Sequence, residues 1–380
     1  MFRFALRQRS LAMLSVIAIL FALSISGTVR AATIIADGNV CTLMDAIRAA
    51  NTDTATGGCP AGSGADTIEM TMRLITQPHG GVDGCSVGLP PITSTITING
   101  HGLNIERGPH PSYGMCLFYV TSSGNLTLND LTLKSGYCML LGGAIYNSGT
   151  VNLNRSTVTN SSSGQGGGGI FNGGTLIITD STISNNVAGD LPGGGIYNVD
   201  RLILIASTVS GNHAGHGGGI ENNDGHTTMI NSTVSGNSAS TLGGGIRNVG
   251  TLDVTYSTIS GNSAAEGGGI SNSGMVIIGN SIIANSPGGD CAGTNYTATN
   301  NRATGACGSI AVTGLDATLG NHGGPTVTHA LMNGSNAIDS GTSCPRPYVD
   351  QRGFDRPQDD ACDIGAYESS FAPRLKDRGS

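Results

Sequence analysis

The feature that most constrains this chain is a short unit that occurs six times between residues 142 and 285. Each copy contains the motif Gly-Gly-Xaa-Ile, and a second motif, Ser-Thr-Val/Ile (Ser-Ile-Ile in the last copy), recurs with it. The first motif places its isoleucines 25, 26, 24, 26 and 24 residues apart, at Ile145, Ile170, Ile196, Ile220, Ile246 and Ile270. Self-similarity at a fixed period of this length is typical of stacked structural units.

Each unit is predicted to contain three short strands. Counted from the Ser of the second motif, positions −5, −3 and +2 are apolar, with Thr227 the exception at −5, and they alternate with polar positions. A period of two is typical of half-buried strands. Gly and β-branched residues fill these segments, and helical spacing of apolar residues is missing, which argues against helices. The sequence therefore predicts an all-β parallel β-helix with one unit per coil.

Stacking of the coils predicts columns of identical side chains. Equivalent residues of neighbouring coils should lie about 4.8 Å apart, so we expect the six isoleucines to form one buried column. The residue two positions after each isoleucine is always Asn, and stacked Asn side chains can hydrogen-bond to one another. We expect the glycine clusters at the tight bends, where positive φ is needed. A leucine-rich repeat has a similar period, but its Leu-Xaa-Xaa-Leu-Xaa-Leu pattern is absent.

Three parts of the sequence resemble known families. Bacterial parallel β-helix proteins related to the polymorphic outer-membrane protein repeats contain strings like GGGIYN and STVSGNSA. The CSLREA domain resembles CTLMDAIRAANTDTATGGCPAGSGADTI, although Thr42, Met44 and Asp45 depart from the sequence that names it. The choice-of-anchor Q domain resembles LGNHGGPTVTHALMNGSNAIDSG with DQRGFDRP and CDIGAYE. This resemblance implies a right-handed, pectate-lyase-like β-helix and a secreted or surface location, and it implies no particular reaction.

These observations divide the chain into six parts. They are a signal peptide (1–31), a CSLREA-like N-terminal cap (32–75), divergent first coils (76–141), regular coils (142–290), C-terminal coils with a choice-of-anchor Q-like cap (291–368) and a polar tail (369–380). Within the first cap, residues 43–50 are predicted to form an amphipathic helix. Such a helix would cover the end of the stack, where unpaired strands and core would otherwise be exposed.

The N-terminus predicts export. Arg3, Arg7 and Arg9 precede an apolar run at residues 11–23, and a small-residue cleavage site ends at Ala31. The run is too short for a typical membrane-spanning helix. We therefore expect a secreted protein, or one associated with the cell surface or outer membrane, with no membrane span after cleavage. A net charge of −7 argues against nucleic-acid binding, and we expect a monomer.

Nine cysteines flank the regular coils. In an exported protein they are expected to form disulfides. Proximity in sequence pairs Cys41 with Cys59, Cys291 with Cys307, and Cys344 with Cys362. Cys85, Cys116 and Cys138 then leave one odd thiol. Cys-Xaa-Xaa-Cys and clustered Cys/His spacings are absent from the sequence, so no zinc site is predicted.

Several strings raise the question of catalysis. Asn51-Thr52-Asp53 and Gly215-His216-Gly217 also occur in β-helix galacturonases, but the first lies in the predicted cap, and hydrolysis needs two carboxylates facing one bond. A polysaccharide lyase would need calcium-binding carboxylates and a base. Catalytic residues therefore stay unassigned, and no cofactor is expected unless the protein is a lyase that uses calcium.

Two further groups have a structural and a functional interpretation. His213, His216 and His226 lie close in sequence, but histidines in turns without Cys or carboxylate partners are more often inert than metal-bound, so no metal site is predicted. Charged residues are dense near the C-terminus, where they would form either a ligand pocket or buried ion pairs; we favour ion pairs. These residues are Asp350, Arg352, Arg356, Asp363 and Glu368.

The residue between Ile and Asn of each repeat is predicted to face outward, because its neighbours on both sides point inward. In order these residues are Tyr146, Phe171, Tyr197, Glu221, Arg247 and Ser271. The rings and the ion pair would either stabilise the sheet alone, which we favour, or form a platform for a glycan or another cell-surface polymer. The predicted function is adhesion or surface interaction without catalysis. The alternative is a polysaccharide-active enzyme, a lyase or a glycoside hydrolase.

Overall fold

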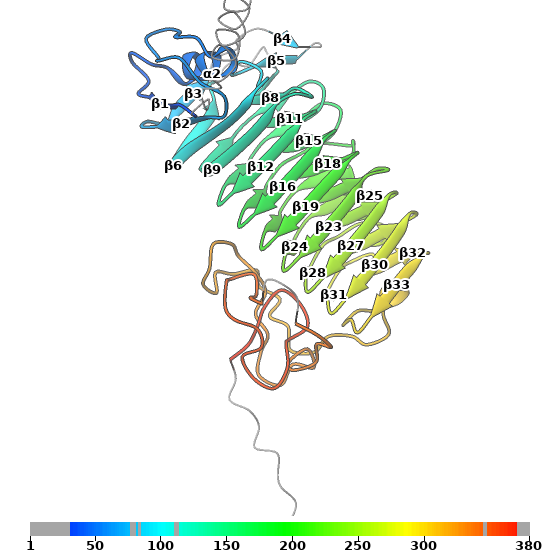
Figure 1. The fold of residues 1–380 in the computed structure, drawn as a ribbon. Coiled ribbons are helices and arrows are strands. Elements are labelled where there is room, and N and C mark those ends of the chain that lie inside the picture. Colours follow the sequence, from blue (N-terminus) through cyan, green and yellow to red (C-terminus); the bar gives the residue numbers. More distant parts are fainter. Residues whose placement is uncertain (1–30, 77–80, 83–84, 110–113, 345–347, 371–380) are drawn as a thin grey trace, which may run out of the picture.

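The computed structural model describes residues 31–76, 81–82, 85–109, 114–344 and 348–370. The predicted signal peptide, except for its last residue, and most of the polar tail lie outside this range. The described chain forms an elongated stack of coils that begins at β1 and ends at β32 and β33 (Figure 1). The predicted parallel β-helix is confirmed.

Three columns of parallel strands make up the coils. The first column contains β12 (Thr150–Asn154), β16 (Thr175–Thr179), β19 (Arg201–Ile205), β23 (His226–Ile230), β27 (Thr251–Thr255), β30 (Met275–Gly279) and β33 (Tyr296–Thr299). The second contains β13 (Thr157–Thr159), β17 (Thr182–Ser184), β20 (Thr208–Ser210), β24 (Thr233–Ser235), β28 (Thr258–Ser260) and β31 (Ile282–Ala284). The third contains β8 (Phe118–Val120), β11 (Ile145–Asn147), β15 (Ile170–Asn172), β18 (Ile196–Asn198), β22 (Ile220–Asn222), β26 (Ile246–Asn248), β29 (Ile270–Asn272) and β32 (Cys291–Gly293).

Two strands of the first coils are longer than those of the regular coils, and several short strands lie outside the three columns. β1 (Thr33–Ala36) pairs with β2 (Asp66–Met70), which pairs with β6 (Thr95–Arg107) and through it with β9 (Asn125–Lys134). β6 and β9 each run through the first and second columns. The remaining strands are β3 (Leu74–Thr76), β4 (Gly81–Val82), β5 (Cys85–Val87), β7 (Met115–Cys116), β10 (Tyr137–Cys138), β14 (Ser162–Ser163), β21 (His213–His216) and β25 (Ser238–Leu242), and a 3-10 helix, η1, spans Gly305–Cys307.

The isoleucine column forms as predicted. Successive Gly-Gly-Xaa-Ile isoleucines are aligned in register, and all six side chains are 0% exposed. The Asn ladder also forms, since each amide from Asn147 to Asn248 donates to the Asn oxygen of the next coil at 2.6 to 2.8 Å. Sequence analysis missed a second ladder, formed by Asn186, Asn212, Asn237 and Asn262. The buried Asn amides of the two ladders are therefore satisfied between coils.

The glycine clusters supply a bend in each coil, as expected, because the first Gly of every Gly-Gly-Xaa-Ile motif has φ between 60° and 70°. The bend between the first and second columns uses other residues. A single residue with positive φ joins the first and second columns in each coil, and it is never glycine from Asp130 onward. Its identities are Asp130, Arg155, Asp180, Ala206, Asn231, Tyr256 and Asn280, with φ between 46° and 51°. Strand pairing on both sides fixes this corner, so residues with some left-handed strain are tolerated there.

A helix lies across the N-terminal end of the stack. α2 (Leu43–Thr52) covers the range predicted as helical and extends it by two residues. Thr42 caps it by accepting a hydrogen bond from the backbone N–H of Asp45. Its buried face, which includes Ala46 and Ile47, joins the same hydrophobic core as Ile34 and Ile68 of the first two strands. The apolar core at this end is therefore shielded from water.

The C-terminal segment does not close the other end of the stack, as the predicted cap would. Residues 319–344 and 348–368 instead turn back and lie along the second strand column (Figure 1, orange to red). Thr208 of β20 donates to the carbonyl oxygen of Val327 at 2.6 Å, and Thr233 of β24 donates to Gln351 Oε1 at 2.6 Å. The outward Thr and Ser hydroxyls of this column supply hydrogen-bonding groups along its length. These hydroxyls make the side of the stack a better docking surface for the C-terminal segment than the end of the stack.

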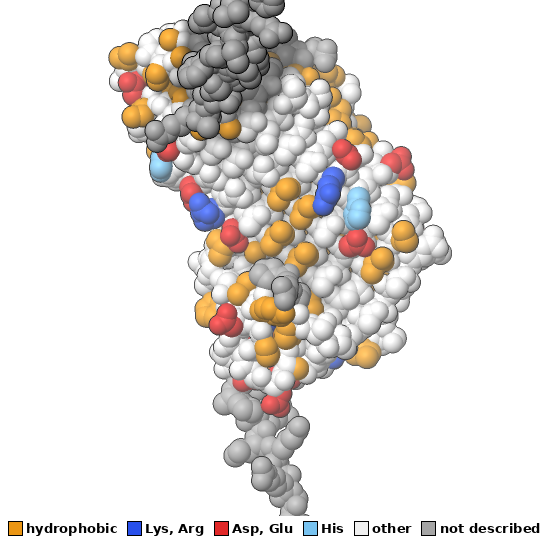
Figure 2. Space-filling model, in the orientation of Figure 1, with side chains coloured by type: hydrophobic (Ala, Val, Ile, Leu, Met, Phe, Trp, Pro, Cys, Tyr) orange, Lys and Arg blue, Asp and Glu red, His pale blue; other side chains and the backbone are white. Residues whose placement is uncertain are grey.

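The surface of the stack is mostly neutral. Charged residues are 11% of the sequence, and the face in Figure 2 carries few charged side chains, with hydrophobic ones gathered in its middle. Arg155 forms one of the exposed ion pairs with Asp130 of the neighbouring coil, at 2.7 Å. Across the described residues, none of the helices has the length and apolar character needed to cross a membrane.

The structure forms all three disulfides predicted from sequence proximity. They are Cys41–Cys59, Cys291–Cys307 and Cys344–Cys362. Cys138 is also disulfide-bonded, and burial raises the pKa of the Cys116 thiol to about 12. Each of the three bridges lies outside the regular coils, in segments without repeated strand pairing.

Reduction is therefore expected to destabilise the flanks. The three bridges join residues 16 to 18 positions apart, and closing a loop of about 15 residues stabilises by roughly 3 kcal/mol in the chain-entropy description. Thermal unfolding with and without reductant should show a midpoint lowered by several degrees, with thiol titration to confirm reduction. An unchanged midpoint in the fully reduced protein would contradict this.

Candidate functional site

A continuous ladder of aromatic and charged side chains runs along the third strand column. The residue between Ile and Asn of each repeat is aligned with its counterpart in the next coil, from Tyr146 to Ser271. The structure adds Tyr119 of β8, which is aligned with Tyr146. Sequence analysis missed Tyr119 because its coil lacks Gly-Gly-Xaa-Ile, although the apolar neighbours Phe118 and Val120 carry the same alternation.

The aromatic half of the ladder is a row of four rings in contact. The ring centroids of Tyr119 and Tyr146 are 5.3 Å apart, those of Tyr146 and Phe171 are 4.9 Å apart, and those of Phe171 and Tyr197 are 5.7 Å apart. The planes are tilted or edge-to-face, at 43° to 72°. These are favourable geometries for aromatic pairs, worth about 0.5–1.5 kcal/mol each beyond burial.

The ladder is less exposed than predicted. Phe171 is 9% exposed and Glu221 is 1% exposed, whereas Tyr146, Tyr197 and Arg247 are half-buried. The Gly217 main chain before β22 packs against Glu221. Phe171 lies between the Tyr146 and Tyr197 rings, and Gly173, after β15, packs against its ring. A Cβ added at Gly217 would lie 2.7 Å from the Glu221 carboxylate. The prediction that the whole row faces solvent was therefore wrong for Phe171 and Glu221, because main chain without side chains packs against them.

The charged half of the ladder centres on Glu221. One carboxylate oxygen, Oε1, accepts a hydrogen bond from Arg247 Nη1 of the next coil. The other, Oε2, lies 3.0 Å from His216 Nδ1 of β21, a distance that needs the proton on Nδ1. The His216 and Arg247 side chains are 33% and 24% exposed, respectively. The buried Glu221 carboxylate thus holds the partly exposed side chains of His216 and Arg247 beside Tyr197.

This arrangement is suited to binding. Half-buried rings offer apolar surface at low entropic cost, and a guanidinium held by a carboxylate keeps N–H groups available for oxygen atoms of a ligand. Arg247 Nε is buried and has no hydrogen-bond partner among the described residues. The acid in this site, Glu221, is engaged by both Arg247 and His216. Glycoside hydrolysis would need a second carboxylate across a cleft from it.

The three histidines considered for metal binding have separate partners. His213 Nδ1 lies 2.9 Å from the Ser238 hydroxyl, and His226 Nε2 lies 2.8 Å from an Asp253 oxygen. His216 contacts Glu221 instead. In the described part of the chain, no three His, Cys, Asp or Glu side chains are grouped in a way that could hold a metal ion.

The galacturonase-like strings lie apart in the fold. Asn51 joins α2 to the next coil, since its amide donates to the carbonyl of Pro91 at 2.8 Å and accepts from Thr93 N–H at 2.9 Å. Asp53 accepts from the N–H of Gly64 at 3.2 Å. His216 belongs to the coil of β19, far along the stack from α2 (Figure 1). These residues form no common site.

The charged residues near the C-terminus form buried ion pairs. The Arg356 and Glu368 side chains are 0% and 1% exposed and meet at 2.9 Å. Arg352 pairs with Asp350 at 2.6 Å and stacks on the ring of Tyr367. Burial raises the pKa of Glu368 to about 7, while Arg356 opposes that rise.

Asp363 completes this cluster, and its carboxylate accepts hydrogen bonds from both the N–H and the hydroxyl of Ser369. The cluster joins turns of the C-terminal segment to one another, and its charged groups face one another. This agrees with the interpretation as buried ion pairs.

Comparisons with known proteins assign no family to this chain. No protein-family model matches the sequence, and no curated protein matches it significantly. Among solved structures, the crystal structure of pectate lyase Pel9A is similar, with a TM-score of 0.48 and 15% sequence identity over 80% of this chain and 88% of that chain.

Proposed function

We propose that this protein is secreted or held at the cell surface and binds a glycan or another cell-surface polymer without transforming it. The observation that carries the proposal is the row of four rings that continues directly into the Glu221–Arg247–His216 cluster. The proposed contact surface consists of Tyr119, Tyr146, Tyr197, Arg247 and His216, which are the half-buried members of this ladder.

The composition of the chain supports a ligand role for the rings. Aromatic residues are 4% of the sequence and Trp is absent, yet four aromatic residues are aligned in consecutive coils. The coil period spaces the rings at 4.9 to 5.7 Å, a regular array that suits an extended, repeating ligand better than a small compact one. The partly exposed guanidinium of Arg247 favours a polymer with hydroxyl or carboxylate groups.

The proposed location has independent support. Disulfides form and persist mainly in oxidising compartments outside the cytosol, and three are present in the flanking segments. The N-terminal sequence has the features of a signal peptide. The resemblance to CSLREA and choice-of-anchor Q segments agrees with a surface protein and forms part of the proposal.

The enzymatic alternative is a polysaccharide lyase or glycoside hydrolase. Incubating the purified protein with acidic and neutral polysaccharides, with and without calcium, distinguishes the two classes. Binding without product release is expected. Release of unsaturated or reducing sugars, lost on chelation or on substitution of Glu221, would replace the binding proposal with the enzymatic one.

The binding surface is tested by replacing Tyr146 and Tyr197 together with Ala. Each ring contributes roughly 0.5–1.5 kcal/mol through stacking, so the apparent affinity for the bound glycan or for whole cells should fall by about tenfold to a hundredfold. The matched control is Tyr137→Ala, a partly exposed ring on β10 outside the ladder. Circular dichroism melts should establish that both variants fold. Unchanged binding by a folded double variant would exclude this surface.

A further inference from the structure

Both ends of the first column finish in an edge strand. β1 is hydrogen-bonded to β2 and β33 to β30, and neither pairs with another described strand, but α2 packs over the core at the N-terminal end. Because the C-terminal segment lies along the side of the coils, β33 remains an edge strand (Figure 1).

The free hydrogen-bonding groups of this edge follow from its pairing with β30. The carbonyls of Asn295 and Thr299 accept from Val276 and Asn280, each at 3.1 Å, so they point back toward the stack. Within a strand, alternate residues direct their N–H and C=O groups to opposite sides. The backbone groups of Tyr296 and Ala298 therefore point away from β30, toward the open side.

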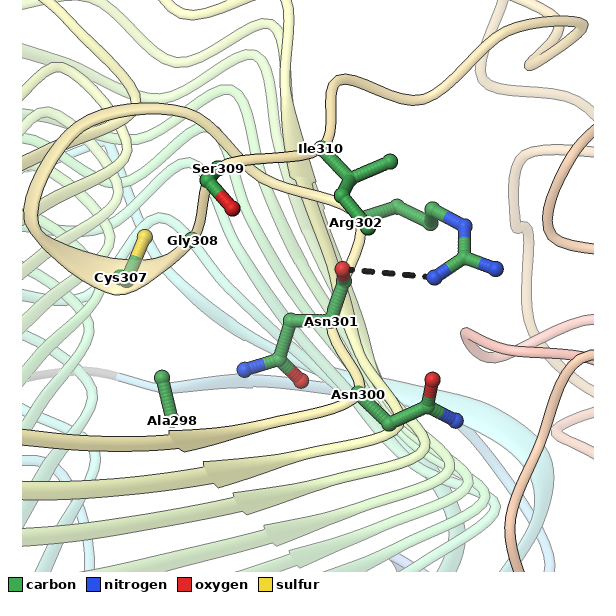
Figure 3. A pocket seen from close by; sticks show the side chains of 8 residues that line it. All are labelled: Ala298, Asn300, Asn301, Arg302, Cys307, Gly308, Ser309 and Ile310. Atoms are coloured by element: carbon green, nitrogen blue, oxygen red, sulfur yellow. Dashed lines mark hydrogen bonds between the residues drawn. The ribbon is translucent and has the colours of Figure 1, made fainter.

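The turn after β33 covers part of the hydrophobic core, since its Ala303 and Cys307 are 0% exposed and belong to that core, but the cover is incomplete at β33 itself. Ala298 is aligned with the buried Ile278 in the core column, but it is exposed. A cavity of about 160 Å³ lies beside it, between the last coil and the turn that contains Cys307 and Gly308 (Figure 3). Ile310, 53% exposed, lies at its rim. An additional strand next to β33 would cover this apolar surface.

The edge lacks the features that usually prevent pairing. Natural edge strands carry charges, proline or bulges, or are covered by other elements. Residues 291–315 contain no Asp, Glu, Lys or Pro. Their one Arg, Arg302, is 9% exposed, and its Nε donates to the Asn336 carbonyl at 2.9 Å. A neutral edge beside an open core is a surface for association.

We propose that β33 pairs with β33 of a second copy of this chain, antiparallel, to form a tail-to-tail dimer. An edge strand is complementary to itself about a two-fold axis, because each copy offers the same alternating donors and acceptors. An axis through Thr297 keeps the core-facing side chains of both copies on one side of the joined sheet. A shift by one residue would bring core-facing residues opposite outward ones.

This association is closed and gives a defined product. The two-fold contact uses the same β33 edge of both copies, so pairing at this edge stops at two. The dimer replaces the monomer expected from the sequence, and it goes beyond the proposed binding function. It would place two aromatic ladders on one rod and allow two contacts to the same polymer or surface, which raises the overall affinity without any new contact.

The test is the mass of the purified mature protein by sedimentation over a range of concentrations. The wild-type protein should reach twice the monomer mass. Ala298→Asp places two carboxylates close together across the two-fold axis, and the dimer should be lost at concentrations where the wild type is mostly dimeric. The matched control is Met275→Asp, on the neighbouring strand β30 but at an exposed outward position. It should dimerise as the wild type does.

Formation of an intermolecular disulfide tests whether the two β33 strands are in contact. Thr297→Cys lies at the proposed axis and should form an intermolecular disulfide under mild oxidation, whereas Met275→Cys should not. A thermal melt of Ala298→Asp close to that of the wild-type monomer would exclude misfolding as the cause of dimer loss. A monomeric wild type, a dimer unaffected by Ala298→Asp, or growth into long chains would each overturn the proposal.

Discussion

Replacing Ile220 with Asn is expected to lower the free energy of unfolding by roughly 3–5 kcal/mol, among the largest effects of a single substitution in the coils. Ile220 is 0% exposed and lies in the middle of the isoleucine column, directly between Ile196 and Ile246. The variant would lose apolar burial and would place an amide where the neighbouring side chains are hydrocarbons. Because each coil contacts the one before and the one after, both interfaces are weakened.

Denaturant unfolding followed by circular dichroism measures this loss. Ile35→Asn is the matched control, because Ile35 lies in β1 but is 58% exposed, and surface substitutions usually change stability by less than about 0.5 kcal/mol. If the two variants unfold at the same denaturant concentration, the isoleucine column does not carry the stability that its burial implies.

Replacing Arg356 with Met is expected to release the C-terminal segment from the side of the coils. The guanidinium donates to Glu368 at 2.9 Å and to the carbonyls of Asp363 and Gly365 at 2.8 and 2.7 Å. Its removal leaves the Glu368 carboxylate buried without its counter-charge. Breaking a buried ion pair in this way costs about 3–5 kcal/mol. The coils retain their own ladders, so the loss should be confined to the segment.

Limited proteolysis separates local release from global unfolding. Arg356→Met should be cut rapidly within residues 319–370 while the coils resist digestion and keep their circular dichroism spectrum. The control is Arg155→Met, which breaks an exposed pair with Asp130, and such pairs contribute about 0–1 kcal/mol. Equal protease resistance of both variants would show that the buried pair is not what holds the segment.

The repeat by itself determined the solenoid. Its period defines the coil, and its alternation decides which side chains point inward, so the isoleucine column and the first Asn ladder follow from local pattern. The helix at residues 43–52 could also be predicted, because capping and amphipathic spacing are local signals. Cysteines close in sequence could be paired for the same reason, since the bridges join residues 16 to 18 positions apart.

The partial burial of the aromatic and charged ladder was decided by the tertiary structure. Glu221 is covered by the main chain of Gly217 before its strand, and Phe171 by the neighbouring rings and by Gly173 after its strand. The alternation carries no signature of either cover. His216 approaches Glu221 from another strand, β21, so the sequence indicated neither that contact nor its link to Arg247.

The position of the C-terminal segment was likewise decided by the tertiary structure. Thr208 bonds to Val327 and Thr233 to Gln351, across 119 and 118 residues of chain. A repeat encodes the contacts of each coil with its nearest neighbours, whereas docking of a non-repetitive segment depends on shape and on hydrogen bonds between distant residues. The same long-range docking, along the side rather than the end, leaves the edge at β33 open.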